Sequence, residues 1–387
     1  MKAFNFDEPT ERRGTGSYKW DSADADVIPL WVADMDFRTA PCIIEALGDR
    51  VRHGVFGYEK VPDAWYEALQ GWFARRHGWQ IRREAVLCTT GVVPAVSAVI
   101  KAFTRPGDGV ALLTPAYNCF FSSIRNNGCF AAETALIEGD AGWTIDFAAL
   151  EKTLADPRVK VLLFCSPHNP AGRVWTADEI RRTAQIAHQA GVLFVCDEIH
   201  GEFVFGGSRY LPAASVEGVY PLRTVILTSP TKTFNLAGLQ ASTAVFPNAH
   251  MKAMFDKFWT DMDIHRNNAF SVTAMEVAFN EGEEWLEQLL PYISANFDFV
   301  VDYCKQHIPK IRTYAPDATY LMWLDCRDLG LSNEALHDFM IQKAKLGLND
   351  GCAFGRSLNG YMRLNVACPR SILEQAMRQL EAAVNSL

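Results

Sequence analysis

The sequence predicts an α/β protein, with a large domain built on a mostly parallel sheet and a smaller α+β domain. Two observations support this. In the middle of the 387-residue chain, short apolar runs alternate with helix-like segments, as expected for strands buried on both faces of a parallel sheet. From about residue 285 the pattern changes to long amphipathic segments with isolated strands between them. Length alone, at roughly 150 residues per domain, favours two to three domains.

Four apolar runs are the predicted strands of the large domain. Each is followed closely by polar or turn-forming residues, which mark its end. A helix begins after Thr176, because Thr176 and Glu179 have the spacing of a capping box, and it ends at Gly191. A second helix follows the turn at Gly91 and covers Val92 to Phe103. The strands are residues 110–114, 161–165, 192–196 and 224–228.

The last hundred or so residues carry a different set of elements. Helices are predicted over 284–307, 333–346 and 371–387, and strands over 319–324 and 361–365. The first 45 residues lack strong periodicity, so we expect them to form an arm on another part of the fold. The predicted organisation is an arm joining the small domain (1–45), a large domain (46–284) and a small C-terminal domain (285–387).

Composition excludes several classes of protein. The net charge is −8, with 37 basic and 45 acidic residues and no Lys/Arg-rich run, so no nucleic-acid partner is expected. The apolar runs are far shorter than the roughly 18 residues that span a membrane. Ten scattered cysteines without a CxxC pair argue against disulfides and a zinc site. With no apolar leader at the N-terminus, we expect a cytoplasmic protein without a metal.

Polar side chains follow the predicted strands where ligands bind in open α/β sheets, outside the carboxyl ends. Lys232 is the most informative of them, because a lysine amine can form a Schiff base with the aldehyde of pyridoxal 5'-phosphate (PLP). Asp197 can keep a pyridine nitrogen protonated. Asn169 and His200 can bond a ring hydroxyl, and Tyr117 can stack on a ring.

A phosphate site is expected at the second helix. Gly91, Val92 and Val93 stand where a turn enters this helix, and backbone N–H groups at a helix start bind phosphate. No GxGxxG follows a predicted strand, so a nicotinamide enzyme is not expected.

Several motifs together resemble one enzyme family. Residues 229–238 (SPTKTFNLAG) and Asn169-Pro-Ala-Gly172 resemble motifs of fold-type I PLP-dependent enzymes, the class I/II aminotransferase superfamily. Within it, the chain most resembles the cystathionine β-lyase branch of MalY/PatB-type C–S lyases. The branch motifs are Asp34-Met-Asp-Phe37, Gly54-Val-Phe-Gly-Tyr58, Thr114-Pro-Ala-Tyr117, Asp197-Glu-Ile-His200 and Arg363-Leu-Asn365. The resemblance implies a three-layer α/β/α PLP-binding domain, as in aspartate aminotransferase.

The resemblance also implies roles for individual residues. Lys232 would hold the cofactor and then remove the Cα proton, with Asp197 at the ring nitrogen. Arg363 would clamp the substrate α-carboxylate, since a guanidinium fork suits a carboxylate. Asn169 and Asp34 would complete the substrate site. The phosphate would be bound by the backbone at Gly91, Val92 and Val93, by Ser229 and Thr231, and by Tyr58.

The family role of Tyr58 requires a second chain, because this tyrosine reaches the phosphate of the neighbouring subunit. It counts with Lys232 and Asp197 as catalytic, and it implies a homodimer with active sites at the subunit interface. Two positions depart from the aminotransferase pattern. His200 replaces a common tyrosine, as in the lyase branch, and Gln240 replaces an arginine that binds phosphate.

The sequence leaves three functions open. The first is a C–S β-lyase that converts cystathionine or a related cysteine conjugate to a thiol, pyruvate and ammonia. The second is an aminotransferase on the same scaffold, and the third is a PLP-binding protein with an added regulatory partner. The small-molecule substrate is an amino acid in the first two. A dicarboxylic substrate is disfavoured, because only Arg38 and Arg266 remain as candidates for a second carboxylate site.

Overall fold

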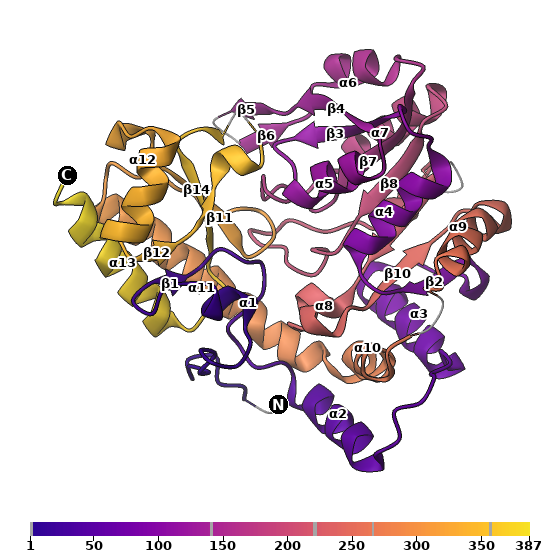
Figure 1. Ribbon diagram of the computed structural model, residues 1–387, viewed down its shortest axis with the longest axis horizontal. Helices are drawn as coiled ribbons and strands as arrows, with labels where there is room; N and C mark the ends of the chain where they lie inside the picture. The colour runs from indigo at the N-terminus through magenta and orange to yellow at the C-terminus, as the bar shows by residue number, and fades with distance from the viewer. Residues whose placement is uncertain (1–2, 140–141, 220–222, 265–266, 356–357) are drawn as a thin grey trace. The chain divides into compact units, whose positions relative to one another are not determined.

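The computed structural model describes residues 3–139, 142–219, 223–264, 267–355 and 358–387. The chain divides into two compact units (Figure 1). The large unit is Thr39–Glu283, and the small unit combines Met1–Arg38 with Glu284–Leu387. Both ends of the chain therefore belong to the same unit.

A seven-stranded sheet forms the centre of the large unit, in the order β2-β10-β9-β8-β7-β3-β4. Five neighbouring strands, from β9 to β4, run parallel, whereas β10 is antiparallel to both of its neighbours. The predicted mostly parallel sheet is thus confirmed. The strands are β2 (Val86–Thr89), β3 (Gly109–Thr114), β4 (Phe130–Ala135), β7 (Val159–Cys165), β8 (Leu193–Asp197), β9 (Thr224–Thr228) and β10 (Ser242–Val245).

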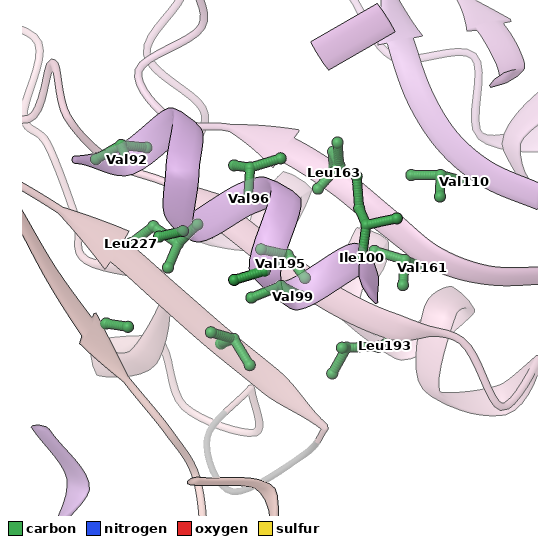
Figure 2. Packing of buried hydrophobic residues seen from close by; sticks show 14 of the residues in the cluster. Val92, Val96, Val99, Ile100, Val110, Val161, Leu163, Leu193, Val195 and Leu227 are labelled. Atoms are coloured by element: carbon green, nitrogen blue, oxygen red, sulfur yellow. The ribbon is translucent and has the colours of Figure 1, made fainter. Parts of the chain in front are cut away.

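Helices cover both faces of this sheet, which gives the expected three layers. Alternate strand residues such as Leu163 and Val195 share a buried cluster with α4, and Figure 2 shows Val96 and Val99 of α4 lying over them. Each fully buried aliphatic side chain contributes about 1.5–3 kcal/mol. The helices on this face are α4 (Val92–Phe103), α5 (Asn118–Asn126) and α9 (Ala249–Asp261), and those on the other are α6 (Phe147–Leu154) and α7 (Ala177–Gln189).

The predicted capping box is present at α7. The Glu179 N–H donates to Thr176 Oγ1 at 3.2 Å, and the Thr176 N–H donates to Glu179 Oε2 at 2.8 Å. Three further helices of the large unit pack together, with α10 against both of the others. They are α2 (Pro41–His53), α3 (Asp63–His77) and α10 (Ala269–Glu281). A hairpin of β5 (Ile137–Gly139) and β6 (Gly142–Thr144) completes the large unit.

The small unit is α+β. Its antiparallel sheet has the order β11-β14-β13, and β1 pairs in parallel with β12. This second pairing joins the N-terminal segment to the C-terminal part of the chain. The strands are β1 (Ile28–Pro29), β11 (Leu321–Asp325), β12 (Leu346–Gly347), β13 (Asn349–Asp350) and β14 (Tyr361–Asn365), and the helices are α1 (Tyr18–Asp21), α11 (Glu283–His307), α12 (Asn333–Asp338) and α13 (Arg370–Val384).

The helix predicted over 333–346 is shorter in the structure. α12 ends at Asp338, a π-type turn covers Phe339–Lys343, and Lys345 has a left-handed φ of 55°. Leu346 then pairs with Ile28 in the β1–β12 ladder. A strand contact with a distant segment therefore overrides the local helical pattern.

Candidate active site

The predicted cofactor-binding side chains of the large unit follow the ends of neighbouring parallel strands. The register places Cys165, the last residue of β7, beside Asp197, the last residue of β8. Asp197 in turn lies beside Leu227 in β9. Because the strands end together, the segments that carry Asn169 and Lys232 leave the sheet at the same edge.

Asp197 is a buried carboxylate whose loss of hydration is only partly offset by hydrogen bonds and nearby charge. Its side chain is 6% exposed and accepts the Ile199 N–H at 3.1 Å. Burial raises the pKa of Asp197 to about 6, although the Ile199 hydrogen bond and the charge of Lys232 both lower it. A cationic N–H placed against this carboxylate would stabilise its charged form.

Lys232 lies on α8 (Pro230–Thr233), a single turn directly after β9. Ser229 caps this turn by accepting the Thr231 N–H at 3.0 Å, and its own hydroxyl donates to the Ala241 carbonyl at 2.6 Å. The hydroxyl oxygens of Ser229 and Thr231 are 2.8 Å apart. The cap anchors the turn to the neighbouring strand, so the backbone that carries Lys232 is fixed.

The start of α4 offers N–H groups for an anion. Gly91 precedes the helix with a φ of 143°, a conformation that favours glycine. Val92 and Val93 are its first two residues, and the N–H groups of a first turn have no acceptor within the helix. They also lie at the positive end of the helix dipole. This geometry suits a phosphate.

Ser242 contacts the turn at Gly91, and sequence reasoning did not single it out. Its hydroxyl accepts the Gly91 N–H at 3.0 Å and lies 2.5 Å from the Thr89 hydroxyl. It begins β10, an antiparallel strand too short and too polar at its start to stand out as an apolar run. Gln240, two residues earlier, is exposed and adds no charge.

Three other predicted residues accompany these groups. Asn169 and His200 are buried, at 4% and 2% exposure. Tyr117 is the N-cap residue of α5, and its ring contacts Phe120 edge-on at 6.0 Å between centroids. The edge thus holds a buried amide, a buried imidazole and a partly buried aromatic ring.

The loop that follows Asp197 and carries His200 is anchored by two buried glutamates. Glu198 accepts the Ala213 N–H at 2.7 Å, and burial raises the pKa of Glu198 to about 7. Glu202 is ion-paired with Arg76 at 2.9 Å. Because these anchors come from other segments of the large unit, the loop has little freedom to move.

Tyr58 differs from the residues at the strand ends, because 86% of its surface is exposed. It follows α2, and apolar side chains in the last turn of this helix and in the segment after it are also exposed. Val51, Val55 and Phe56 are 57%, 62% and 59% exposed. An exposed apolar cluster of this kind is typical of a surface that another protein chain covers.

Arg363 and Asp34 belong to the small unit. Arg363 lies in the middle of β14 with 4% of its surface exposed. Asp34 forms an ion pair with Arg12 at 2.7 Å. Its carboxylate therefore already has a cationic partner within the small unit.

Arg38 and Arg266 are the two candidates for a second carboxylate site. Arg38 is exposed, and Arg266 lies outside the described residues. Within the described part of the chain, no cluster of three or more His, Cys, Asp or Glu residues could bind a metal. No helix there is long and apolar enough to cross a membrane.

The donor set at the sheet edge suits PLP. A lysine amine can react with the aldehyde. A buried carboxylate, whose charged form a cation would stabilise, can face the ring nitrogen. An amide and an imidazole can meet the ring hydroxyl, while helix N–H groups and two hydroxyls can bind the phosphate. Each polar group of the cofactor has a chemical counterpart among these residues.

Comparison with known proteins gives matches over the whole chain. The family model for aminotransferase class I and II matches residues 25–380. Cystathionine beta-lyase PatB of Bacillus subtilis is 38% identical, covering 98% of this chain and 100% of the relative. Protein MalY of Escherichia coli is 35% identical, covering 99% and 100%. The crystal structure of cystalysin from Treponema denticola, which contains PLP, has a TM-score of 0.96 at 34% identity over 100% of both chains.

Proposed function

The chain belongs to the aminotransferase class I and II family, and we propose that it is a PLP-dependent carbon–sulfur β-lyase. Its substrates would be cystathionine or related cysteine S-conjugates, and its products a thiol, pyruvate and ammonia. The observation that carries this proposal is the 38% identity to a cystathionine beta-lyase over 98% of the chain. The topology agrees with a PLP site, because β8 ends at Asp197 beside β9 and the turn that carries Lys232 follows β9.

We assign the large unit as the cofactor-binding domain. Bound PLP supplies an electron sink for the carbon next to the amino group. Asp197 holds a proton on the ring nitrogen, and the Lys232 amine takes the proton from the substrate Cα. Asn169 and His200 would hydrogen-bond the ring hydroxyl, and Tyr117 would stack on the ring.

We assign substrate binding to three residues. Arg363 of the small unit binds the α-carboxylate as a cation with a planar fork of donors. Asn169 and Asp34 line the substrate site, and Asp34 does so while paired with Arg12. Fixing the carboxylate limits the rotation of the bound amino acid, which contributes to the rate by lowering the entropy lost on reaching the transition state.

The phosphate site and Tyr58 support a homodimer. Gly91 forms the turn and its N–H is bound to Ser242, whereas Val92 and Val93 offer the backbone N–H groups of a first helical turn. Ser229 and Thr231 would bind the phosphate by turning their hydroxyls away from their present contacts. Gln240 stands where many aminotransferases have a phosphate-binding arginine, so the phosphate requires another partner. We propose that Tyr58 of a second copy provides it, with active sites at the subunit interface. The exposed apolar cluster of Val51, Val55 and Phe56 would be covered in that dimer.

The cysteines support a cytoplasmic location. All ten are free thiols, and five of them are buried. Thiols persist in a reducing compartment, whereas secreted proteins commonly form disulfides. We therefore propose the cytoplasm as the site of action.

The proposal is tested by measuring products in parallel. The holoenzyme is incubated with cystathionine, cystine and S-alkyl cysteines without any keto acid. With cystathionine and S-alkyl cysteines, pyruvate, ammonia and thiol should appear in equal amounts, because the thiolate leaves by elimination and one water then hydrolyses the remaining enamine to pyruvate and ammonia. With cystine the sulfur product is a persulfide in place of the thiol. A second series adds a keto acid and measures amino-group transfer.

The two series separate lyase from aminotransferase. Pyruvate release that needs no keto acid supports the lyase. Turnover that occurs only with a keto acid, together with transfer of the amino group to it, would overturn the lyase in favour of the aminotransferase. The relative rates with the different sulfur compounds rank the leaving groups.

A further inference from the structure

The guanidinium of Arg363 is held by two hydrogen bonds within the small unit. Its Nη2 donates to Asn349 Oδ1 at 2.7 Å and to the Trp31 carbonyl at 3.2 Å. A guanidinium nitrogen of this type carries two protons, so both protons of Nη2 are engaged. Two bonds from one nitrogen fix the rotation of the planar group.

An aromatic ring covers one face of the same guanidinium. The ring centroid of Phe354 lies 4.4 Å from Arg363 Cζ, within the range of a cation–π contact. Phe354 is 1% exposed and meets Trp323 edge-on at 5.6 Å. Because the ring is itself confined, it holds the plane of the guanidinium as well as its rotation.

The backbone that supplies the Trp31 carbonyl is also fixed. The Asn365 N–H donates to the Leu30 carbonyl at 2.9 Å, and Asn365 Nδ2 donates to the Val32 carbonyl at 2.7 Å. The Tyr320 hydroxyl donates to the Ala33 carbonyl at 2.8 Å. The acceptors of Arg363 are thus built into the small unit before any substrate arrives.

We propose that Asn349 and Phe354 are positioning residues that set the direction of Arg363 for the substrate α-carboxylate. This inference rests on the proposed function in that it takes an α-amino acid as the ligand. A preoriented guanidinium binds a carboxylate with less loss of freedom than a mobile one. The two residues therefore determine specificity for ligands that carry an α-carboxylate, without touching the ligand themselves.

The test measures binding with a probe that cannot react. The amino acid α-methylalanine has no hydrogen on Cα, so Lys232 has no proton to remove. Its carboxamide has the same shape but no carboxylate. Both are titrated into the holoenzyme, and the change in cofactor absorbance gives the dissociation constants. The ratio of the two constants reports recognition of the carboxylate alone.

Asn349→Ala should weaken binding of the acid by about 10- to 100-fold, the range for losing a hydrogen bond to a charged group. Binding of the amide should change little. Phe354→Leu keeps apolar volume but removes the ring face, so it should weaken acid binding by about 2- to 30-fold. Asn333→Ala is the matched control, because Asn333 bonds Asn359 and Gly360 instead.

The outcomes distinguish this inference from the proposed function. Equal losses for acid and amide, or no loss in either variant, would overturn the positioning role. A wild-type enzyme that binds the acid no better than the amide would overturn it as well. Normal acid preference with the expected losses, but no pyruvate from sulfur substrates, would refute only the lyase.

Discussion

The two units place their proposed functional residues in different ways. In the large unit, Asn169, Asp197 and Lys232 follow the ends of parallel strands, so the topology of the sheet brings their segments to one edge. In the small unit, Arg363 lies mid-strand, and its acceptors come from 14 and 332 positions away. A strand end is a local feature, whereas the surroundings of Arg363 exist only after distant segments have met.

The two units also differ in how their buried carboxylates are compensated. At the edge of the large unit, burial raises the pKa of Asp197 to about 6 and that of Glu198 to about 7. In the small unit, Asp36 bonds both Arg12 and Lys19, at 2.6 and 2.8 Å. The first arrangement leaves a carboxylate that a cationic ligand would stabilise, which is typical of functional sites. The second is already compensated and is typical of a scaffold.

The largest expected effect separates chemistry from binding. Lys232→Ala should lower kcat by at least about 10²- to 10⁴-fold, the usual contribution of a general base, and should abolish the absorbance band of the lysine-bound cofactor. Stopped assays and absorbance spectra measure the two effects. Lys257→Ala is the control, because Lys257 is an exposed lysine paired with Asp261. Full lyase activity in Lys232→Ala would refute the assignment of the large-unit site.

The next effect concerns stability without the cofactor. Asp197 has a folded pKa of about 6 against an ordinary 3.8, so the folded state binds more protons and loses stability as pH rises between these values. Asp197→Asn removes this loss. The cofactor-free variant should therefore be about 3 kcal/mol more stable than wild type above pH 7, at about 1.4 kcal/mol per pKa unit. The advantage should vanish near pH 4.

Urea unfolding across this pH range measures the difference. Added cofactor should reduce or reverse the advantage, because a protonated ring nitrogen stabilises the carboxylate of the wild type. An advantage that did not depend on pH would mean that burial of the Asp197 charge is not its cause.

A smaller effect is expected for the clamp in the small unit. Arg363→Lys keeps the charge but loses the planar fork. KM for the sulfur substrate should rise by about 10- to 100-fold, the range for a hydrogen bond between charged groups, with a smaller change in kcat. Steady-state kinetics measure both constants, with Arg327→Lys as the control. A fall in kcat at constant KM would place Arg363 in the chemistry and not in binding.

The sequence predicts features that depend on neighbouring residues better than features that depend on contacts between distant segments. The apolar runs predicted the parallel sheet, and the polar residues after them predicted which segments leave the sheet at one edge, because both features are encoded by neighbours in the chain. β10 and Ser242 were not predicted, because a short antiparallel strand that begins with a hydroxyl residue does not form a recognisable apolar run. Asn349 and Phe354 were not predicted either, because their contacts with Arg363 form only when separate segments of the small unit pack together.

The smallest effects test whether the two units are stabilised separately. Asn248 caps α9 in the large unit by accepting the Met251 N–H at 2.9 Å, and Ser332 caps α12 in the small unit by accepting the Ala335 N–H at 3.2 Å. Each change to alanine should cost about 1 kcal/mol of stability, the typical value for an N-cap. Amide hydrogen exchange should accelerate in the unit that carries the change, while kcat and KM stay constant. Acceleration spread equally over both units would show that they unfold as one cooperative body.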